Sequence, residues 1–358
     1  MRVGVDARHL TASRGVARYT RALLGALAAA HPDDEWLAFV PGRAPVPAVP
    51  DGVRLIRNPL PGRALFGAAA ITRRPRLDRR IPGGVDVVWA PAPAPLAVSR
   101  GVPLVLTVHD RSFEERPRDF TAYERVWHRL ARPRALAERA DAVVCDTHAG
   151  REDLARAWGV RATVVSPGPL LGGHVARDAP PSTSESTSPM PYLLYVGALE
   201  PRKGLDVLQA AYALARERGL TADLVVVGAG RVPIDGPGVW RLGSATDDRE
   251  LADLYAGALA VVAPSWLEGF GLPPVEAAAL GTPSVVSDLE VFAETLRDGA
   301  LRVPPGDVDA FADALVRIAA DEELRERLGA AARSAAARYD WAAAAQTMHA
   351  VLAGAAAR

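Results

Sequence analysis

Residues 264–283, PSWLEGFGLPPVEAAALGTP, constrain the fold more than any other stretch of this chain. An apolar run at 259–263 precedes them and is short enough to be a buried strand. A glycine-containing loop follows at 268–271, and then come two prolines, which suit the first turn of a helix. Gly281 and Pro283 end that helix. The stretch is therefore predicted to be a strand, a loop and a helix N-terminus, where free backbone N–H groups bind phosphate.

Two carboxylates stand in this stretch, Glu268 on the loop and Glu276 in the first turns of the helix. A carboxylate accepts hydrogen bonds from sugar hydroxyls, and two carboxylates at this separation can hold two ends of one ligand. The alternative interpretation is an acidic helix start that interacts favourably with the helix dipole. Spacing alone does not decide between these two interpretations.

The segment EGFGLPPVEAAALGTP, with its Glu-x7-Glu spacing, resembles the signature of family 4 glycosyltransferases. These are retaining enzymes with the GT-B fold, and the chain is most similar to their bacterial mannosyltransferase-like branch. The resemblance implies that Glu268 lies beside the donor sugar and that Glu276 binds the ribose of the nucleotide. Backbone amides near Gly271 and Leu272 then hold the diphosphate. The donor-binding residues that the resemblance implies on this loop are Gly269, Phe270, Gly271 and Leu272.

A second glycine-containing loop follows the predicted strand at 192–196 and opens a helix at Leu205. It reads GALEPRKG, and its two adjacent cations, Arg202 and Lys203, suit a diphosphate. Lys203 is the single lysine beside 41 arginines, which favours a requirement for a compact ammonium over a stray residue. The resemblance implies that these two cations neutralise the donor diphosphate, although Ala198 stands where the family commonly has arginine. The other donor-binding residues that it implies are Gly197 on this loop, and Leu242 and Ser244 near the base.

The N-terminal half opens as a nucleotide-binding fold does, with a strand at 2–6, a loop and a helix. The family usually has two glycines in this loop and this chain has one, Gly15, so a plain turn is the alternative to an acceptor or phosphate site. The residues that would serve that site are Gly15, Arg18, Tyr19 and Asp110.

The buried strand at 103–108 ends in His109 and Asp110, at the strand end where open α/β sheets bind ligands. The resemblance implies that His109 lies against the donor sugar; the alternative is a histidine whose hydrogen bonds are satisfied by the core. Residues 111–139 are predicted to be helical and basic, a surface on the acceptor side. Thr147 is predicted to cap the helix after the strand at 141–146.

The length of 358 residues allows two domains, each with its own core. Residues 176–191, rich in serine, threonine and proline, are predicted to link an N-terminal acceptor-binding domain, 1–175, to a C-terminal nucleotide-sugar-binding domain, 192–337. An alanine-rich helix at 338–358 is expected to pack back on the first domain. A single cysteine, no signal peptide and no long apolar run predict a cytoplasmic protein.

Net charge is zero, but residues 1–180 carry +9 and residues 181–358 carry −9. The basic half contains ITRRPRLDRR at 71–80, with five arginines. We expect a solvated surface helix there; the alternative is a contact with an anionic acceptor or with lipid headgroups at the inner membrane face. No aromatic residues interleave with the arginines, so nucleic acid is not expected as a partner.

The sequence therefore predicts an α/β protein of GT-B fold, with two Rossmann-like domains facing across a cleft. The expected reaction moves a hexose from a nucleoside-diphosphate sugar to a hydroxyl of a glycan, a lipid-linked or a small-molecule acceptor, with retention and without a metal or other cofactor. GDP-mannose is the first donor expected by resemblance, with UDP-, ADP- and dTDP-sugars as alternatives. The rival hypotheses are a sugar-nucleotide epimerase of the same fold and a catalytically degenerate subunit that binds glycan or a partner.

Overall fold

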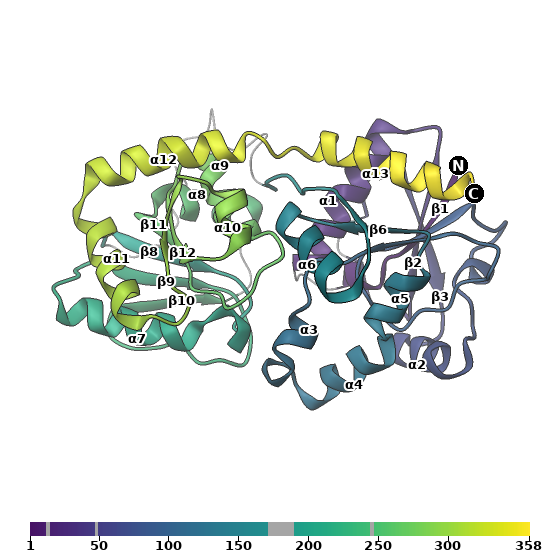
Figure 1. The fold of residues 1–358 in the computed structure, drawn as a ribbon, viewed down its shortest axis with the longest axis horizontal. Helices are drawn as coiled ribbons and strands as arrows, with labels where there is room; N and C mark the ends of the chain where they lie inside the picture. The colour runs from purple at the N-terminus through teal and green to yellow at the C-terminus, as the bar shows by residue number, and fades with distance from the viewer. Residues whose placement is uncertain (12–14, 47–48, 171–189, 244–246) are drawn as a thin grey trace. The chain divides into compact units, whose positions relative to one another are not determined.

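In the computed structural model, residues 1–11, 15–46, 49–170, 190–243 and 247–358 are described (Figure 1). They form two compact units. Residues 1–168 and 339–358 make up unit 1, and residues 169–338 make up unit 2. Most of the predicted linker, residues 176–189, lies outside the described residues.

Unit 1 is built on a parallel sheet with the strand order β3-β2-β1-β4-β5-β6-β7. The strands are β1 (Arg2–Asp6), β2 (Glu35–Pro41), β3 (Val53–Asn58), β4 (Val87–Ala90), β5 (Leu104–Thr107), β6 (Ala142–Cys145) and β7 (Ala162–Val164). Alternate side chains enter two separate cores. Trp89 lies in one core and Val88 in the other, so both faces of the sheet are buried, as the apolar strands predict.

Helices cover both faces of this sheet. They are η1 (Arg8–Thr11), α1 (Gly15–Ala30), α2 (Gly62–Thr72), η2 (Asp78–Arg80), α3 (Ser112–Glu115), η3 (Pro117–Asp119), α4 (Ala122–Ala131), α5 (Pro133–Arg139), α6 (His148–Trp158) and α13 (Trp341–Ala356). The C-terminal helix α13 lies beside α1 in Figure 1, and Met348 and Leu352 bury their side chains in the core under it. The prediction that this helix packs back on the N-terminal domain is confirmed.

Unit 2 is also built on a parallel sheet, with the strand order β10-β9-β8-β11-β12-β13. Its strands are β8 (Tyr192–Val196), β9 (Asp223–Val227), β10 (Val239–Gly243), β11 (Ala260–Ala263), β12 (Ser284–Ser287) and β13 (Ala300–Val303). Its helices are η4 (Pro201–Lys203), α7 (Leu205–Glu217), α8 (Asp248–Gly257), α9 (Leu272–Leu280), α10 (Glu290–Thr295), α11 (Val308–Ala320) and α12 (Glu322–Ala336). The order reverses between the neighbours β8 and β11, and ligands of open α/β sheets bind at such a switch point.

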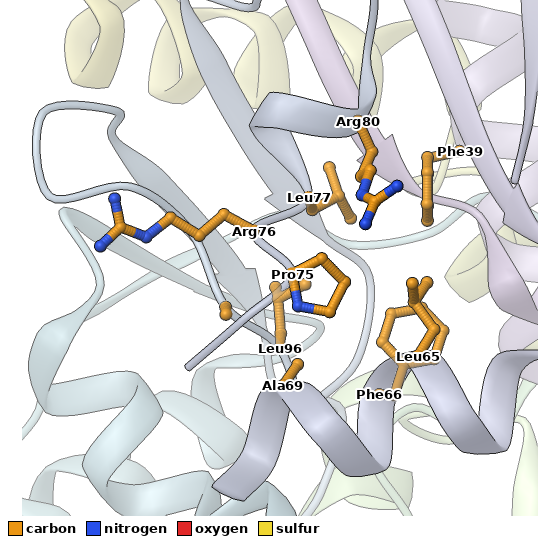
Figure 2. Close-up of a pocket in the computed structure, with 10 residues that line it drawn as sticks. Phe39, Leu65, Phe66, Ala69, Pro75, Arg76, Leu77, Arg80 and Leu96 are labelled. Carbon is orange, nitrogen blue, oxygen red and sulfur yellow. The ribbon is translucent and has the colours of Figure 1, made fainter. Parts of the chain in front are cut away.

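The prediction of a surface helix at 71–80 is wrong. Helix α2 ends at Thr72, and only the short η2 follows, because Pro75 lacks an N–H and disfavours helical backbone in the residue before it. Figure 2 shows Leu77 turned toward Leu65 and Phe66 of α2, with the Arg76 guanidinium pointing away. Leu77 thus anchors a segment that has no α-helix and whose Arg73, Arg74, Arg79 and Arg80 are exposed.

The segment 111–139 is helical only in pieces. It contains α3, η3, α4 and α5, separated at Arg116, Phe120 and Arg132. Pro117 and Pro133 each begin a new helix, which is the helical position that proline tolerates. The prediction that Thr147 caps α6 is confirmed, since its hydroxyl accepts a hydrogen bond from the Gly150 N–H at 3.0 Å.

Candidate functional site

The candidate site of unit 2 forms where two loops meet at the switch point. One loop follows β8 and contains η4; the other follows β11 and leads into α9. The Trp266 N–H donates to the Arg202 carbonyl at 3.0 Å, which joins the loops. At Gly204, with φ of 67°, a Cβ atom would lie 2.0 Å from the Pro264 carbonyl oxygen, so only glycine permits this approach.

An ion pair crosses between the two loops. The Lys203 Nζ lies 2.6 Å from the Glu268 Oε1, and the Ser265 hydroxyl donates to the same oxygen at 2.8 Å. The side chains of Lys203 and Glu268 are 16% and 12% exposed, so solvent screens the pair only partly. Sequence reasoning named both residues but missed their pairing. It also missed Ser265.

The neighbouring cation, Arg202, is paired within its own loop. Its Nε donates to the Glu200 Oε2 at 3.0 Å, and both side chains are mostly buried. Gly197 lies at the start of this loop with its N–H bonded to the Val227 carbonyl, and a Cβ there would meet the Tyr195 hydroxyl at 3.0 Å. The structure therefore brings Gly197, Arg202 and Lys203 onto one loop beside Glu268.

The N-terminus of α9 has no side-chain cap among the described residues. Gly271 is its N-cap residue, with φ of 82°. Pro273 and Pro274 carry no N–H, so the helix start presents the amides of Gly271 and Leu272. Gly269 and Phe270 lie on the loop just before them, and Phe270 is buried.

Glu276 differs sharply from Glu268 in its surroundings. It is fully buried, and its Oε2 accepts a hydrogen bond from the Tyr255 hydroxyl of α8 at 2.8 Å. Tyr255 is itself held through its carbonyl, which accepts from the Thr282 hydroxyl at 2.7 Å. Sequence reasoning missed Tyr255. The ribose contact of Glu276 stays a prediction.

Of the two residues expected near the base, only Leu242 lies within the described residues. Leu242 lies on the edge strand β10 and packs against the core between the sheet and α8. Ser244 lies outside the described residues.

The candidate residues of unit 1 gather at the carboxyl edge of its sheet. His109 follows β5, and its Nδ1 lies 2.8 Å from the Asp146 Oδ2, at the end of β6. The Tyr19 ring of α1 meets the His109 ring edge-on, with 4.6 Å between centroids. Burial acts to lower the pKa of His109, but the carboxylates of Asp146 and Asp110 and the backbone carbonyl of Pro91 together outweigh it, so the pKa is raised.

Two further residues of this edge were missed from the sequence. His9 on η1 has its pKa lowered to about 4 by burial. Arg8 forms an ion pair with the buried Asp6 at 2.6 Å, and its guanidinium lies 3.2 Å from the centre of the Phe66 ring. Of the predicted phosphate-loop residues, Gly15 begins α1 at the surface, Arg18 is half-buried, and Asp110 accepts a hydrogen bond from the Ser112 N–H.

Among the described residues, no three His, Cys, Asp or Glu side chains are grouped so that they could hold a metal ion. None of the helices in the described ranges is long and apolar enough to cross a membrane.

Comparison with known proteins gives matches along most of the chain. Residues 190–321 match the family "Glycosyl transferases group 1", and residues 13–168 match "Glycosyltransferase Family 4". D-inositol 3-phosphate glycosyltransferase from Kribbella flavida is 30% identical over an alignment of 340 residues. The alignment covers 82% of this chain and 76% of that protein.

Phosphatidyl-myo-inositol mannosyltransferase from Mycobacterium leprae is 35% identical over 213 residues. That match covers 53% of this chain and only 54% of the relative, about half its length. Among solved structures, HepE of Anabaena, in complex with UDP and glucose, aligns with a TM-score of 0.68 at 18% identity, over 98% of this chain and 99% of that one.

Proposed function

The chain belongs to the family 4 glycosyltransferases and has their GT-B fold, and from this premise we propose that it moves a hexose from a nucleoside-diphosphate sugar to an acceptor hydroxyl with retention. The observation that carries the proposal is the ion pair of Lys203 and Glu268, at 2.6 Å, at the point where the two switch-point loops meet. It joins a cation of one loop to a carboxylate of the other, and that carboxylate precedes Gly271, the N-cap of α9, by three residues.

The proposed chemistry divides these groups between the two parts of the donor. The leaving diphosphate gains charge during transfer, and Lys203 together with the amides of Gly271 and Leu272 would stabilise that charge. Glu268 accepts hydrogen bonds only, so it suits the hydroxyls of the sugar. A carboxylate accepts several hydrogen bonds, so in the proposed ribose contact Glu276 accepts one from a ribose hydroxyl in addition to the one from Tyr255.

For the substrates, GDP-mannose is the first donor to test, by similarity to the mannosyltransferase branch. Both relatives are named for an inositol phosphate, one for the free phosphate and the other for the lipid. Inositol 3-phosphate and phosphatidylinositol are therefore the first acceptors to test. The +9 charge of residues 1–180 suits an anionic acceptor of either kind.

We also propose a peripheral contact between unit 1 and an anionic membrane surface. Helices α2 and α4 are in contact, and Ile71, Tyr123 and Val126 on them are 78%, 53% and 53% exposed. Exposed arginines accompany these apolar side chains on the same two helices and on the segment after α2, at Arg73, Arg74, Arg125 and Arg129. Apolar side chains among cations favour the headgroup region of anionic lipids. Failure to sediment with vesicles of anionic phospholipid at low salt would remove this contact.

The decisive experiment measures nucleoside diphosphate release and glycoside formation together. Wild type and Glu268→Gln are incubated with GDP-mannose, UDP-glucose, ADP-glucose or dTDP-glucose and each acceptor. We expect one donor to give equal amounts of both products. NMR of the glycoside should show that the anomeric configuration of the donor is retained. We expect Glu268→Gln to lose about a hundredfold in rate. Glu294→Gln, a carboxylate on α10 outside the two loops, is the matched control and should keep its rate.

The rival activities give different results in the same experiment. An epimerase converts the sugar nucleotide without releasing free nucleoside diphosphate. A degenerate binding subunit gives neither product, and Glu268→Gln then changes ligand binding alone. Either result would overturn the proposal.

A further inference from the structure

Two neighbouring strands of unit 1 bring His109 and Asp146 together. Strands β5 and β6 pair in parallel with Thr107 opposite Val144, so the residues that follow them lie at the same edge of the sheet. His109 comes two residues after β5 and Asp146 directly after β6. Their side chains are 18% and 5% exposed, and the 2.8 Å between Nδ1 and Oδ2 is the length of a charge-assisted hydrogen bond.

Among the described residues, the Asp146 side chain makes its one hydrogen bond to His109. It stands just before α6, but the cap of that helix is Thr147, whose hydroxyl accepts from the Gly150 N–H. The backbone at Asp146 is fixed separately, because its carbonyl accepts from the Ser166 hydroxyl at 2.9 Å. A carboxylate buried at this place is costly unless it is paired, and the pairing goes to His109.

The groups around the His109 ring favour its charged form. The carboxylates of Asp146 and Asp110 and the backbone carbonyl of Pro91 stabilise a protonated ring. Burial acts against them, whereas His9 on η1 adds no opposing charge, because burial lowers its pKa to about 4 and keeps that imidazole neutral near pH 7. Tyr19 of α1 presents a ring and a hydroxyl whose pKa burial raises, so it adds no charge near neutral pH. The carboxylates prevail, and the pKa of His109 lies above its ordinary value.

We propose that Asp146 is a positioning residue that holds His109 as a doubly protonated imidazolium, with the Nδ1 proton donated to Asp146 and the Nε2 proton donated to an oxygen of the nucleotide-sugar. The proposal rests on the proposed transferase function for its substrate. The pairing of the two side chains and the charge on His109 do not depend on that function.

The pairing is tested first by a measurement that needs no substrate. Nitrogen-15 and proton NMR of the full chain, with labelled histidine, follows both ring nitrogens of His109 from pH 5 to 9. His109→Gln assigns its signals. We expect Nδ1 to stay protonated throughout in wild type while Nε2 titrates. In Asp146→Asn, which keeps the shape and an acceptor oxygen but removes the charge, we expect His109 to lose its proton at a lower pH.

The consequence for catalysis is tested by pH–rate profiles of the same proteins. A rate that requires charged His109 falls as pH rises through the pKa of His109. We expect that fall to move to lower pH in Asp146→Asn, with kcat reduced about tenfold at pH 8, as expected for a lost charge-assisted hydrogen bond. Asp146→Glu, which keeps the charge, should return the fall toward its wild-type position. Asp51→Asn, at an exposed turn of the same unit, is the control and should leave the profile unchanged.

The outcomes separate the two proposals. If His109 titrates identically in wild type and Asp146→Asn, the positioning role of Asp146 is wrong whatever the activity. If the titration shifts but the pH–rate profile does not, the pair is structural and its catalytic role is wrong. If no donor reacts with wild type, the proposed function fails, while the NMR titration still decides the pairing.

Discussion

Lys203 and Glu268 lie 65 residues apart in the chain, yet their Nζ and Oε1 atoms are 2.6 Å apart in unit 2. The main-chain bond between Trp266 and Arg202 and the close passage of Gly204 past Pro264 fix the two loops that carry them. The single lysine of the chain is therefore already positioned by protein contacts. A diphosphate that binds there meets an ordered cation, and little side-chain entropy remains to be lost.

Replacement of Lys203 by methionine should abolish the stabilisation that a nucleoside diphosphate gives to wild type. The substitution keeps the length of the side chain and removes the charge that meets the diphosphate. A ligand at about 100 times its dissociation constant adds about 2.7 kcal/mol, and hence several degrees in melting temperature. We expect that shift in wild type with one nucleotide among UDP, GDP, ADP and dTDP, and no shift in Lys203→Met, measured by thermal unfolding.

Arg327→Met, on the exposed side of α12, controls for loss of a surface cation and should keep the wild-type shift. Lys203→Arg should recover only part of the binding, because a planar guanidinium does not replace a compact ammonium. Equal nucleotide shifts in wild type and Lys203→Met would place the diphosphate elsewhere.

A methyl group at Gly204 should separate the two loops. Both Gly204 and Gly219 have positive φ, so alanine strains the backbone at either by about 1 kcal/mol. A Cβ at Gly204 also meets the Pro264 carbonyl oxygen at 2.0 Å, whereas at Gly219 it meets nothing within 4 Å. We expect Gly204→Ala to lose nucleotide binding and to melt several degrees below Gly219→Ala. Identical melting and binding of the two variants would show that the loops can part without consequence.

Much of this architecture follows from local patterns. Short apolar runs between helices predict two parallel sheets, and the glycines and prolines of 264–283 place the start of α9. Lys203 is found from composition, because a lone lysine among arginines is informative. The rule that polar residues after buried strands mark ligand sites finds His109, and applied to the strand at 141–146 it would also have found Asp146.

Other features depend on contacts that no local pattern encodes. Glu276 stands in the same motif as Glu268, but it is buried, and the hydroxyl of Tyr255, 21 residues earlier, donates a hydrogen bond to its carboxylate. The arginine-rich segment after α2 has the charge pattern of a surface helix, yet Leu77 and Asp78 turn inward, and Asp78 accepts from the Ser99 N–H. Tertiary partners of this kind override local propensity.

The buried His9 should make unit 1 sensitive to acid. Its pKa is lowered to about 4 in the folded state, while in the unfolded chain it is near 6.5. The unfolded state therefore binds the proton first as pH falls. The contribution of neutral His9 to the free energy of unfolding is fully present above about pH 6.5 and is lost as pH falls toward 4. At pH 5 the loss is about 2 kcal/mol.

His9→Gln, which does not titrate, should remove this loss. We expect the difference in unfolding free energy between wild type and His9→Gln to change by about that amount between pH 7 and pH 5, in denaturant titrations. The raised pKa of His109 changes the free energy of unfolding with pH in the opposite direction. Because His109 is present in both proteins, its contribution cancels in the difference between them. Parallel pH dependences of the two proteins would show that His9 is hydrated in the folded state.

Truncation of Leu352 should destabilise unit 1 although the residue lies near the end of the chain. Leu352 is fully buried with Met348 in the core beneath α13, which packs on α1. Leu352→Ala leaves a cavity in that core and should cost about 2–5 kcal/mol. For a unit of this size the calorimetric transition should fall by about 5–15 °C. Gln346→Ala, exposed on the same helix, controls for changed helix propensity and should stay within about 0.5 kcal/mol of wild type. If both variants have the melting temperature of wild type, α13 is not part of the cooperative core of unit 1, and its packing there adds nothing to stability.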